Sequence, residues 1–392
     1  MAIQKLTATY LCPGDRKPQK GQVLILNEQG RILAIEPSSD HDPASVKHYE
    51  GLLAPGFINA HCHLELSHLK GRVPTGTGLL PFLKGVVSLR EVDPEIIQEA
   101  IAREDQAMYD SGIQAVGDIC NTADTVPVKS GSPIDYYSFV ELFDFMQDSQ
   151  AQSTYDRARP VLAGQRSTRH AVSAVPHAPY TVSDTLYKFI QKENDRGATI
   201  SLHNQETPHE DALFLNGSGG FPAFFRDFGI DFNFDAPGTS SLVYARKRLH
   251  PDQPILLVHN TLSSPEDIRE AMDWNPSTFW VTCPNANLYI ENRMPDYRKF
   301  QEAGATLAIG TDSLTSNWQL SIFEEMKTIL RYQSYLAFEE VLRWATYHGA
   351  LALQMDDRLG SFEAGKQPGV IWIQTKPAQP FNLEGAQVQR VF

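Results

Sequence analysis

The sequence contains few cysteines, and this scarcity limits the kinds of site that it can build. The four residues Cys12, Cys62, Cys120 and Cys283 are far apart and form no Cys-x-x-Cys pair. A disulfide framework or a thiolate zinc site normally needs cysteines at short, regular spacings. The pattern indicates neither, so a metal site would have to use other side chains.

Long apolar segments and excess positive charge are also missing. Residues 1–20 contain no apolar run of signal-peptide length, and no run reaches the roughly 18 residues of a membrane helix. The 34 lysines and arginines are outnumbered by 47 aspartates and glutamates, which gives a net charge of −13. This charge repels nucleic-acid phosphates and anionic membranes. We expect a cytoplasmic protein that binds neither nucleic acid nor membrane.

The two ends of the chain have a β character that its middle lacks. The strand-like segments are residues 23–27, 31–36, 369–373 and 387–392. A chain of 392 residues is also longer than one ordinary core. We therefore predict a small β-sandwich domain formed from both termini, residues 1–55 and 346–392.

Between these ends, strand-like and helix-like segments alternate. Asp93, Ser183 and Ser264 are typical helix N-caps, and proline follows the first and the last of them. Eight strands alternating with helices predict an α/β protein with a (β/α)8 TIM-type barrel over residues 56–345. The eight candidate strands are residues 53–60, 114–118, 136–143, 172–175, 199–203, 255–259, 278–282 and 306–310.

One connection of this barrel is unusually long. It runs from Glu206 to His250 and is rich in phenylalanine and glycine. Loops longer than about 12–15 residues usually have a function or contain helices of their own. We predict a capping insertion around residues 207–250 above the barrel mouth; a purely structural helical insertion is the alternative.

Metal-ligating residue types stand at the ends of the predicted strands, where barrel enzymes place their chemistry. His61 and His63 follow the first strand, His203 ends the fifth, and Asp312 follows the eighth. A spacing of two residues on an extended segment turns both imidazoles toward one face. Three imidazoles and a carboxylate suit Zn²⁺, and also Fe²⁺ or Mn²⁺. We expect these four residues to hold a divalent ion.

Two further residues have the chemistry of proton transfer. Glu206 stands three residues after His203, one step beyond the proposed ligand, where a carboxylate can take a proton from water and pass it on. His259 ends the sixth strand, and it is either a further ligand or a hydrogen-bonding group that orients the attacking oxygen.

Five motifs stand in a fixed order: LAPGFINAHCH at residues 53–63, PHAPY at 176–180, HNQE at 203–206, CPN at 283–285 and GTDSLTSN at 310–317. Together they resemble the amidohydrolase superfamily, in the branch of triazine hydrolases and of nucleoside, purine and cytosine deaminases. Residues 61–69 look most like the aminodeoxyfutalosine deaminases of menaquinone biosynthesis.

This resemblance implies a single metal ion, held by His61, His63, His203 and Asp312. Members with two metal ions use a lysine at the end of strand four, and residues 171–175 contain none. The resemblance also implies that His177 contacts the substrate and that Ser316 reaches a polar group on it. Ala286 departs from the serine that the family often has there, which leaves the contact from the seventh strand open.

Glu65 and several basic residues are candidates for substrate binding. Glu65 continues the alternation of the His-x-His segment, so it could face the cavity and accept hydrogen bonds from the substrate. Its alternative is a loop carboxylate paired with Lys70 or Arg72. A carboxylate on the substrate would need a basic partner, and the candidates are Lys84, Arg90, Arg157 and Arg159.

The function that we expect is hydrolytic removal of the 6-amino group of an adenine nucleoside. Glu206, His259 and Asp312 would be catalytic, and aminodeoxyfutalosine is the best single substrate. The alternatives are guanine or cytosine deamination, triazine dechlorination and, with less support, a non-catalytic barrel. The resemblance implies a small-molecule substrate and a homodimer.

Overall fold

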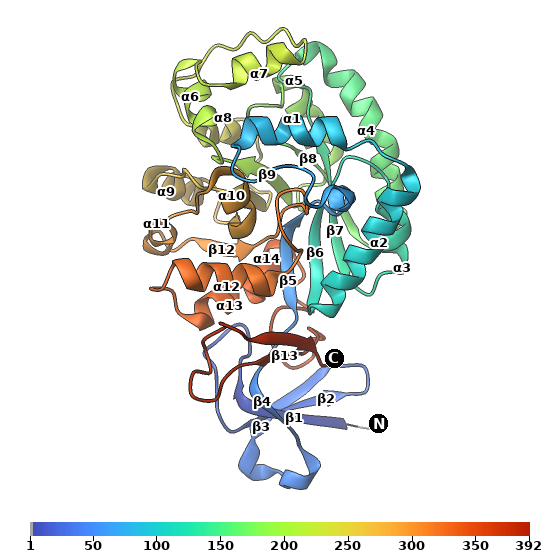
Figure 1. Ribbon diagram of the computed structural model, residues 1–392, viewed down its shortest axis with the longest axis vertical. Helices are drawn as coiled ribbons and strands as arrows, with labels where there is room; N and C mark the ends of the chain where they lie inside the picture. Colours follow the sequence, from blue (N-terminus) through green and yellow to red (C-terminus); the bar gives the residue numbers. More distant parts are fainter. Residues whose placement is uncertain (1–2) are drawn as a thin grey trace.

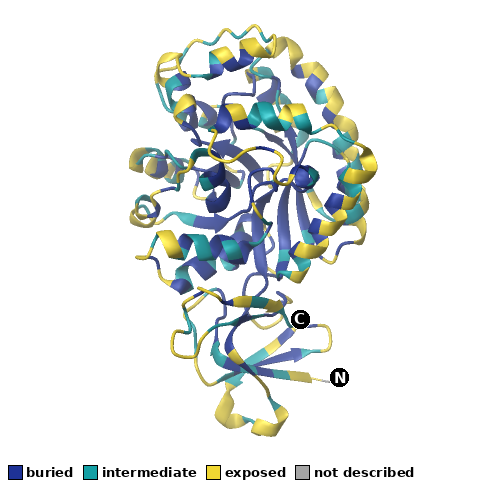
Figure 2. Ribbon diagram, viewed as in Figure 1, coloured by how far each residue is buried: buried dark blue, intermediate teal, exposed yellow. Residues whose placement is uncertain are grey.

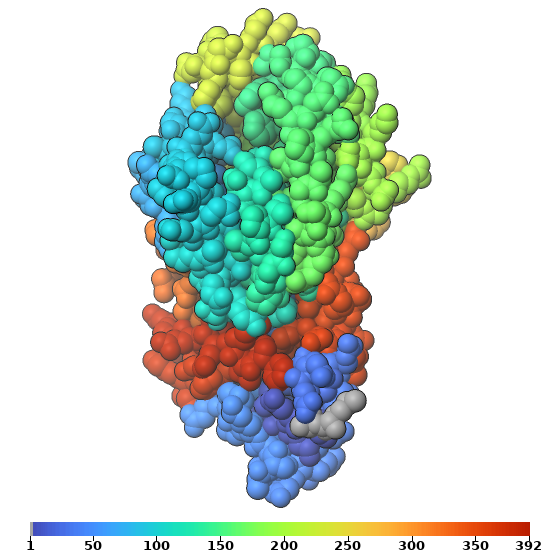
Figure 3. All heavy atoms as spheres, turned by 90° about the vertical axis from the view of Figure 1, so that its right-hand side faces the viewer, coloured from blue at the N-terminus to red at the C-terminus, as the bar shows by residue number. Residues whose placement is uncertain are grey.

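The computed structural model describes residues 3–392 and has a large helix-rich part above a smaller β part (Figure 1). Both ends of the chain lie in the β part. In Figure 3 the blue and red atoms of the two ends adjoin at the lower end of the molecule.

The β part is one six-stranded sheet. Its C-terminal strand β13 pairs antiparallel with β4, which pairs parallel with the N-terminal strand β1. Strands from both termini therefore pair in one sheet, whereas the predicted sandwich is not confirmed. In spatial order the strands are β14 (Gln387–Arg390), β13 (Ile371–Gln374), β4 (Lys47–Ala54), β1 (Ile3–Leu11), β2 (Gln22–Asn27) and β3 (Ile32–Pro37).

The helix-rich part contains eight parallel strands in two sheets, ordered β5-β6-β7-β8 and β9-β10-β11-β12. All eight predicted strands are present, and the α/β class is confirmed. The first predicted strand, residues 53–60, covers parts of two strands, because Pro55-Gly56 separates β4 from β5. The strands are β5 (Phe57–Cys62), β6 (Ile113–Cys120), β7 (Asp135–Leu142), β8 (Ala171–Pro176), β9 (Ile200–Asn204), β10 (Ile255–His259), β11 (Thr278–Thr282) and β12 (Thr306–Ile309).

The two parallel sheets are joined by hydrogen bonds at both edges. Beyond β12, the backbone N–H groups of Thr311 and Asp312 donate to the carbonyl of His61 on β5, at 2.9 and 3.0 Å. On the other side, the N–H of His203 on β9 donates to the carbonyl of His177, just after β8, at 2.9 Å. These bonds bring the carboxyl ends of β5, β8, β9 and β12 together.

Helices surround the parallel strands, with buried inner faces and exposed outer faces (Figure 2). The side chains of Asp93, Ser183 and Ser264 accept backbone N–H groups at the starts of α2, α5 and α9, so all three predicted caps are present. The helices of this shell are α2 (Pro94–Asp110), α3 (Val126–Gly131), α4 (Ala151–Arg166), α5 (Asp184–Glu193), α9 (Pro265–Trp274), α10 (Pro284–Glu291), α11 (Tyr297–Glu302), α12 (Ile322–Tyr332), α13 (Phe338–Ala345) and α14 (Tyr347–Ala352).

The long connection after β9 contains three short helices, α6 (Pro208–Asn216), α7 (Phe221–Asp227) and α8 (Ser241–Arg246). Figure 1 shows them beside α1 (Leu79–Leu89) at the end of the molecule opposite the β part. Phe221, Phe224 and Phe225 share a buried cluster with Phe82 of α1 and with Tyr180. Aromatic packing thus holds this segment against the carboxyl ends of the strands.

None of the helices within residues 3–392 has the length and apolar character needed to span a bilayer. All four cysteines are buried and unbridged, as their spacing predicts.

Candidate active site

Four side chains of metal-ligating type converge at the carboxyl ends of the parallel strands. The Nε2 atoms of His61 and His63 are 3.1 Å apart. The Asp312 Oδ1 atom lies 3.3 Å from His63 Nε2 and 3.7 Å from His61 Nε2. The ring of His203 is centred 4.9 Å from that of His61. The structure therefore brings together all four predicted ligands, which come from three strands.

This donor set fits a divalent metal ion. Nitrogen atoms that share an ion at about 2.0–2.1 Å lie ~3.4 Å apart in a tetrahedral arrangement, close to the spacing seen. The groups His61–His63–Asp312 and His61–His203–His259 each place their ligand atoms within 4.8 Å of one another. Burial lowers the pKa of His63 to about 3 and that of His203 well below its usual value. The imidazoles are therefore neutral, which is the ligating form.

A third group, Glu141, His177 and His203, also has its ligand atoms within 4.8 Å. It shares His203 with the group His61–His203–His259. The Nδ1 atom of His203 donates to the carbonyl of His177 at 2.8 Å, so this nitrogen is not free for a second ion. The geometry supports one metal site.

Glu206 lies between a tyrosine hydroxyl and a histidine ring. Its Oε1 atom accepts a hydrogen bond from the hydroxyl of Tyr180 at 2.6 Å, and its Oε2 atom lies 3.6 Å from His259 Nε2. The other ring nitrogen of His259 donates to Asn287 Oδ1 at 2.8 Å, so Nε2 faces the site. The structure thus places Glu206 and His259 side by side next to the proposed ligands.

Backbone geometry at the strand ends aims these side chains. Gln205, His259 and Asp312 have φ angles of 47°, 76° and 57°, in the left-handed region that costs a non-glycine residue energy. The carboxylate of Glu210, on α6, accepts the backbone N–H groups of Gln205 and Glu206, both at 3.1 Å. These bonds hold the backbone at Gln205 and Glu206 in place.

His177 lines the cavity, as the resemblance implied. Its Nδ1 atom donates to the hydroxyl of Thr181 at 2.9 Å, and that hydroxyl donates to the carbonyl of Ala178. Burial lowers the pKa of His177 to about 4, which keeps the ring neutral. Its Nε2 atom is therefore a hydrogen-bond acceptor.

Glu65 is placed differently from the expectation of a substrate contact. It is buried, and its Oε2 atom accepts the N–H groups of Asn121 and Thr122 and the hydroxyl of Thr122, all at 3.0 Å. Its Oε1 atom lies 3.4 Å from Arg90 Nη2, so neither Lys70 nor Arg72 is its partner. Both oxygens are thus engaged by protein groups, and Glu65 itself does not line the cavity.

Ser316 is also not placed in the cavity wall. Its hydroxyl donates to Asp312 Oδ2 at 2.6 Å. The residue is fully buried, so this bond orients the carboxylate of Asp312 from behind. The structure gives Ser316 a positioning contact where the resemblance implied a substrate contact.

The cavity has an apolar wall and one basic residue. Phenylalanines from α1, α7 and the loop after β7 line the wall, and among residues 3–392 Arg90 is the only lysine or arginine that lines the cavity. The other basic candidates lie elsewhere: Lys84 pairs with Asp227, Arg157 donates to Thr154, and Arg159 lies near Asp156 on α4.

Sequence reasoning missed several residues of the cavity, above all Glu141, Asn121 and Tyr180. Glu141 stands near the end of β7, so the strand-end rule that selected His61 and His203 would also have found it. Asn121 directly follows β6 and could have been found in the same way. Tyr180 ends the PHAPY motif, but the motif does not show its role, because Tyr180 reaches Glu206 through a tertiary contact.

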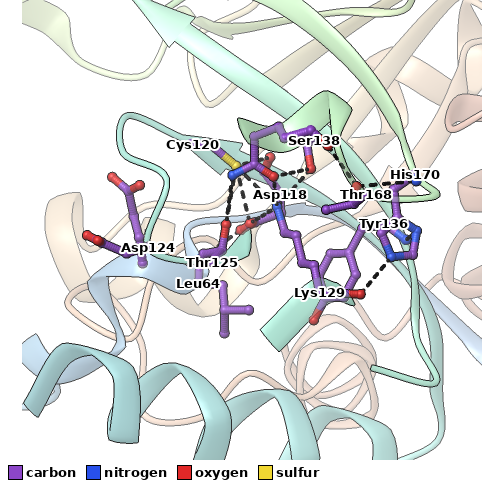
Figure 4. A network of polar contacts seen from close by, with 12 residues as sticks. Leu64, Asp118, Cys120, Asp124, Thr125, Lys129, Tyr136, Ser138, Thr168 and His170 are labelled. Carbon is purple, nitrogen blue, oxygen red and sulfur yellow. Dashed lines mark hydrogen bonds and ion pairs between the residues drawn. The ribbon is translucent and has the colours of Figure 1, made fainter. Parts of the chain in front are cut away.

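A buried ionic network supports the loop after the His-x-His segment (Figure 4). The ammonium of Lys129 lies 2.6 Å from Asp118 Oδ2 and donates to the Ser138 hydroxyl at 2.8 Å. The Oδ1 atom of Asp118 accepts the N–H of Leu64, which follows His63, at 2.8 Å. The network therefore links β6 and α3 to a proposed ligand.

We expect Lys129→Met to lower the free energy of unfolding by about 3–5 kcal/mol, because it leaves the charge of Asp118 buried without a partner. The double variant Lys129→Met with Asp118→Asn should recover most of that loss. Urea titration of the three proteins measures both quantities. A loss below ~1 kcal/mol in the single variant contradicts the importance of the pair.

The sequence profile described as Amidohydrolase family matches residues 52–392. A curated protein named adenosine deaminase from Helicobacter pylori is 28% identical over 322 residues, 81% of this chain and 77% of that protein. A protein named aminodeoxyfutalosine deaminase from Nitratiruptor is 27% identical over 301 residues, 73% of this chain and 70% of that protein.

Solved structures have the same fold. A crystal structure of the Helicobacter pylori aminofutalosine deaminase with methylthio-coformycin superposes with a TM-score of 0.82 at 22% identity, covering 99% of this chain and 100% of that one. An adenosine deaminase from Xanthomonas campestris with bound zinc gives a TM-score of 0.74 at 23% identity, covering 96% and 88%.

Proposed function

The chain belongs to the amidohydrolase family, and we propose that it is a metal-dependent deaminase that removes the 6-amino group of an adenine nucleoside. The observation that carries this proposal is the contact of Glu206 with Tyr180 and His259 beside the three histidines and Asp312. The names of the two curated relatives support the substrate class. Aminodeoxyfutalosine, an intermediate of menaquinone biosynthesis, is the best single substrate.

The proposal includes the architecture that holds the site. The hydrogen bonds at both sheet edges support one closed (β/α)8 barrel. The helices of residues 207–250 would be its cap, because their phenylalanines line the cavity. The limit between the domains at residue 55 agrees with the break after β4. Ala350 of α14 shares a buried cluster with Ile58 of β5. We therefore place the boundary at which the chain returns to the β part after α14 instead of at residue 346.

His61, His63, His203 and Asp312 would hold the metal ion, with zinc preferred and iron or manganese as alternatives. When bound, a divalent ion supplies a Lewis acid that makes water a nucleophile near neutral pH.

The residues of this chain would move the protons. Glu206 takes a proton from the attacking water at its carboxylate and delivers it to the ring nitrogen next to C6. His259 Nε2 accepts a hydrogen bond that keeps this water oriented. The water oxygen bonds to C6, and its second proton passes by way of Glu206, which is a carboxylate again, to the amino group. The C6–N bond then breaks, so ammonia leaves and C6 keeps the oxygen. Ser316 and Tyr180 hold Asp312 and Glu206 in position for these steps.

Deamination fits this geometry better than the alternatives do. An amine must be protonated before it leaves, whereas chloride is not, and Glu206 beside His259 can supply that proton. The convergence of the full donor set argues against a non-catalytic barrel. The proposed partner is a small molecule; a cytoplasmic location and a homodimer stay predictions.

The cavity also favours a nucleoside with an acidic extension. Arg90 lines it beside the phenylalanine wall, and in residues 3–392 its guanidinium has one hydrogen-bond partner, Glu65. We expect Arg90→Ala to raise KM for aminodeoxyfutalosine by about 10–10²-fold, the value of a hydrogen bond to a charged group. KM for adenosine, which has no carboxylate, should change much less. Arg157→Ala is the matched control, and an equal effect from it contradicts the assignment.

Ammonia release across a panel tests the function. The panel contains adenosine, aminodeoxyfutalosine, adenine, guanine, cytosine and a chlorotriazine assayed for chloride. We expect the highest kcat/KM with the adenine nucleosides. Activity confined to guanine, cytosine or the triazine contradicts the substrate and leaves the metal site unaffected.

A further inference from the structure

Glu141 is a buried carboxylate in the cavity wall to which the reaction above gives no role. It stands near the end of β7 and lines the same cavity as Glu206 and Asp312. Its Oε2 atom accepts a hydrogen bond from Asn121 Nδ2 at 3.0 Å. Its Oε1 atom is buried and has no hydrogen-bond partner in the protein.

His203 is in ionic contact with this free oxygen, but its ring proton is already donated elsewhere. His203 Nδ1 lies 3.5 Å from Glu141 Oε1, but its proton is donated to the carbonyl of His177. A buried acceptor without a donor is unfavourable, because it has lost its hydration without replacement. A donor on the ligand would remove this cost, so the oxygen is suited to a polar group of the substrate.

Glu141 is also held in a fixed position. Asn121, which binds its other oxygen, donates its backbone N–H to Glu65 Oε2. Glu65 in turn lies beside Arg90. Glu65 is therefore a positioning residue that fixes Asn121 and Arg90. Asn121 in turn holds Glu141, and Arg90 lines the cavity. The alternation of the His-x-His segment suggested Glu65 as the carboxylate that meets substrate hydroxyls. The residue placed for this contact is Glu141, on β7.

We propose that Glu141 Oε1 accepts a hydrogen bond from a sugar hydroxyl of the substrate and makes the enzyme prefer nucleosides with an intact ribose. A carboxyl oxygen without a partner accepts hydrogen bonds, and ribose hydroxyls are donors. The other two carboxylates of the wall are engaged: Glu206 by Tyr180, and Asp312 by Ser316. This inference rests on the proposed function, since it assumes a nucleoside in the cavity.

The test compares kcat/KM for the better nucleoside of the panel, adenosine or aminodeoxyfutalosine, with that for its 2′,3′-dideoxy analogue. The native enzyme should favour the intact ribose by about 10–10²-fold, the contribution of one hydrogen bond to a charged group. In Glu141→Ala this ratio should fall close to 1, because only the intact nucleoside loses a contact. Metal content is measured in every preparation, since Glu141 adjoins a proposed ligand.

Glu104→Ala is the matched control, because Glu104 is a buried carboxylate on α2 that does not line the cavity. Its ratio should equal the native one. Asn121→Ala is a second variant that keeps the carboxylate and releases Oε2, and it should lower the ratio in part.

An unchanged ratio in Glu141→Ala with metal retained overturns the role of Glu141. Equal kcat/KM for the intact nucleoside and its dideoxy analogue in the native enzyme also overturns this role. This comparison needs no variant, so it decides the question even if Glu141→Ala does not fold. A native enzyme that deaminates no nucleoside instead refutes the proposed function itself.

Discussion

Replacing Glu206 by glutamine is expected to lower kcat by about 10²–10⁴-fold, the usual loss when a general acid–base group is removed. The amide has nearly the same size as the carboxylate and can still contact Tyr180, so the packing around it should persist. It cannot take up and release the proton. Steady-state ammonia release gives the rate, and elemental analysis confirms that the metal remains.

Tyr180→Phe provides a graded comparison. It removes only the hydrogen bond to Glu206 Oε1, so kcat should fall less than in Glu206→Gln. A near-native kcat in Glu206→Gln with metal intact rules out Glu206 as the proton-transfer group. A larger loss in Tyr180→Phe would instead assign that role to the tyrosine.

Removing the metal is expected to abolish activity. We expect the purified protein to contain one divalent ion per chain, and dialysis against a chelator should remove ion and activity together. Zinc added back to the stripped protein should restore the activity. Elemental analysis before and after dialysis identifies the ion and distinguishes zinc from iron or manganese.

Variants separate the ligands from their neighbours. His61→Ala and His203→Ala should each lower the metal content sharply, since each removes one donor of the convergent set. His259→Asn should keep the metal and lower kcat, because its Nε2 faces Glu206. Loss of metal in His259→Asn would make His259 a ligand. Two ions per chain, or full activity without any, contradicts the single-metal site.

Much of the fold followed from local patterns. The strands β10 and β11 match the predicted residues 255–259 and 278–282, because short apolar runs between turn and cap residues define both ends. The first strand of the N-terminal sheet was missed. In β1 exposed and buried positions do not alternate cleanly, and its pairing with β4 depends on residues about 40 positions away.

The metal-binding residues were also accessible from the sequence, because a parallel barrel brings all carboxyl strand ends to one face. Once strands are assigned, His61, His203 and Asp312 must lie near one another whatever the details of packing. The substrate-binding residues were not determined in this way. Glu141 stands near the end of β7, whereas Glu65 lies in a short 3-10 helix, Leu64–Leu69, that follows β5. Contacts from Asn121, Thr122 and Arg90 turn Glu65 away from the cavity. Strand order and spacing predict which residues share a face, whereas hydrogen-bond partners distant in sequence decide which carboxylate stays free for a ligand.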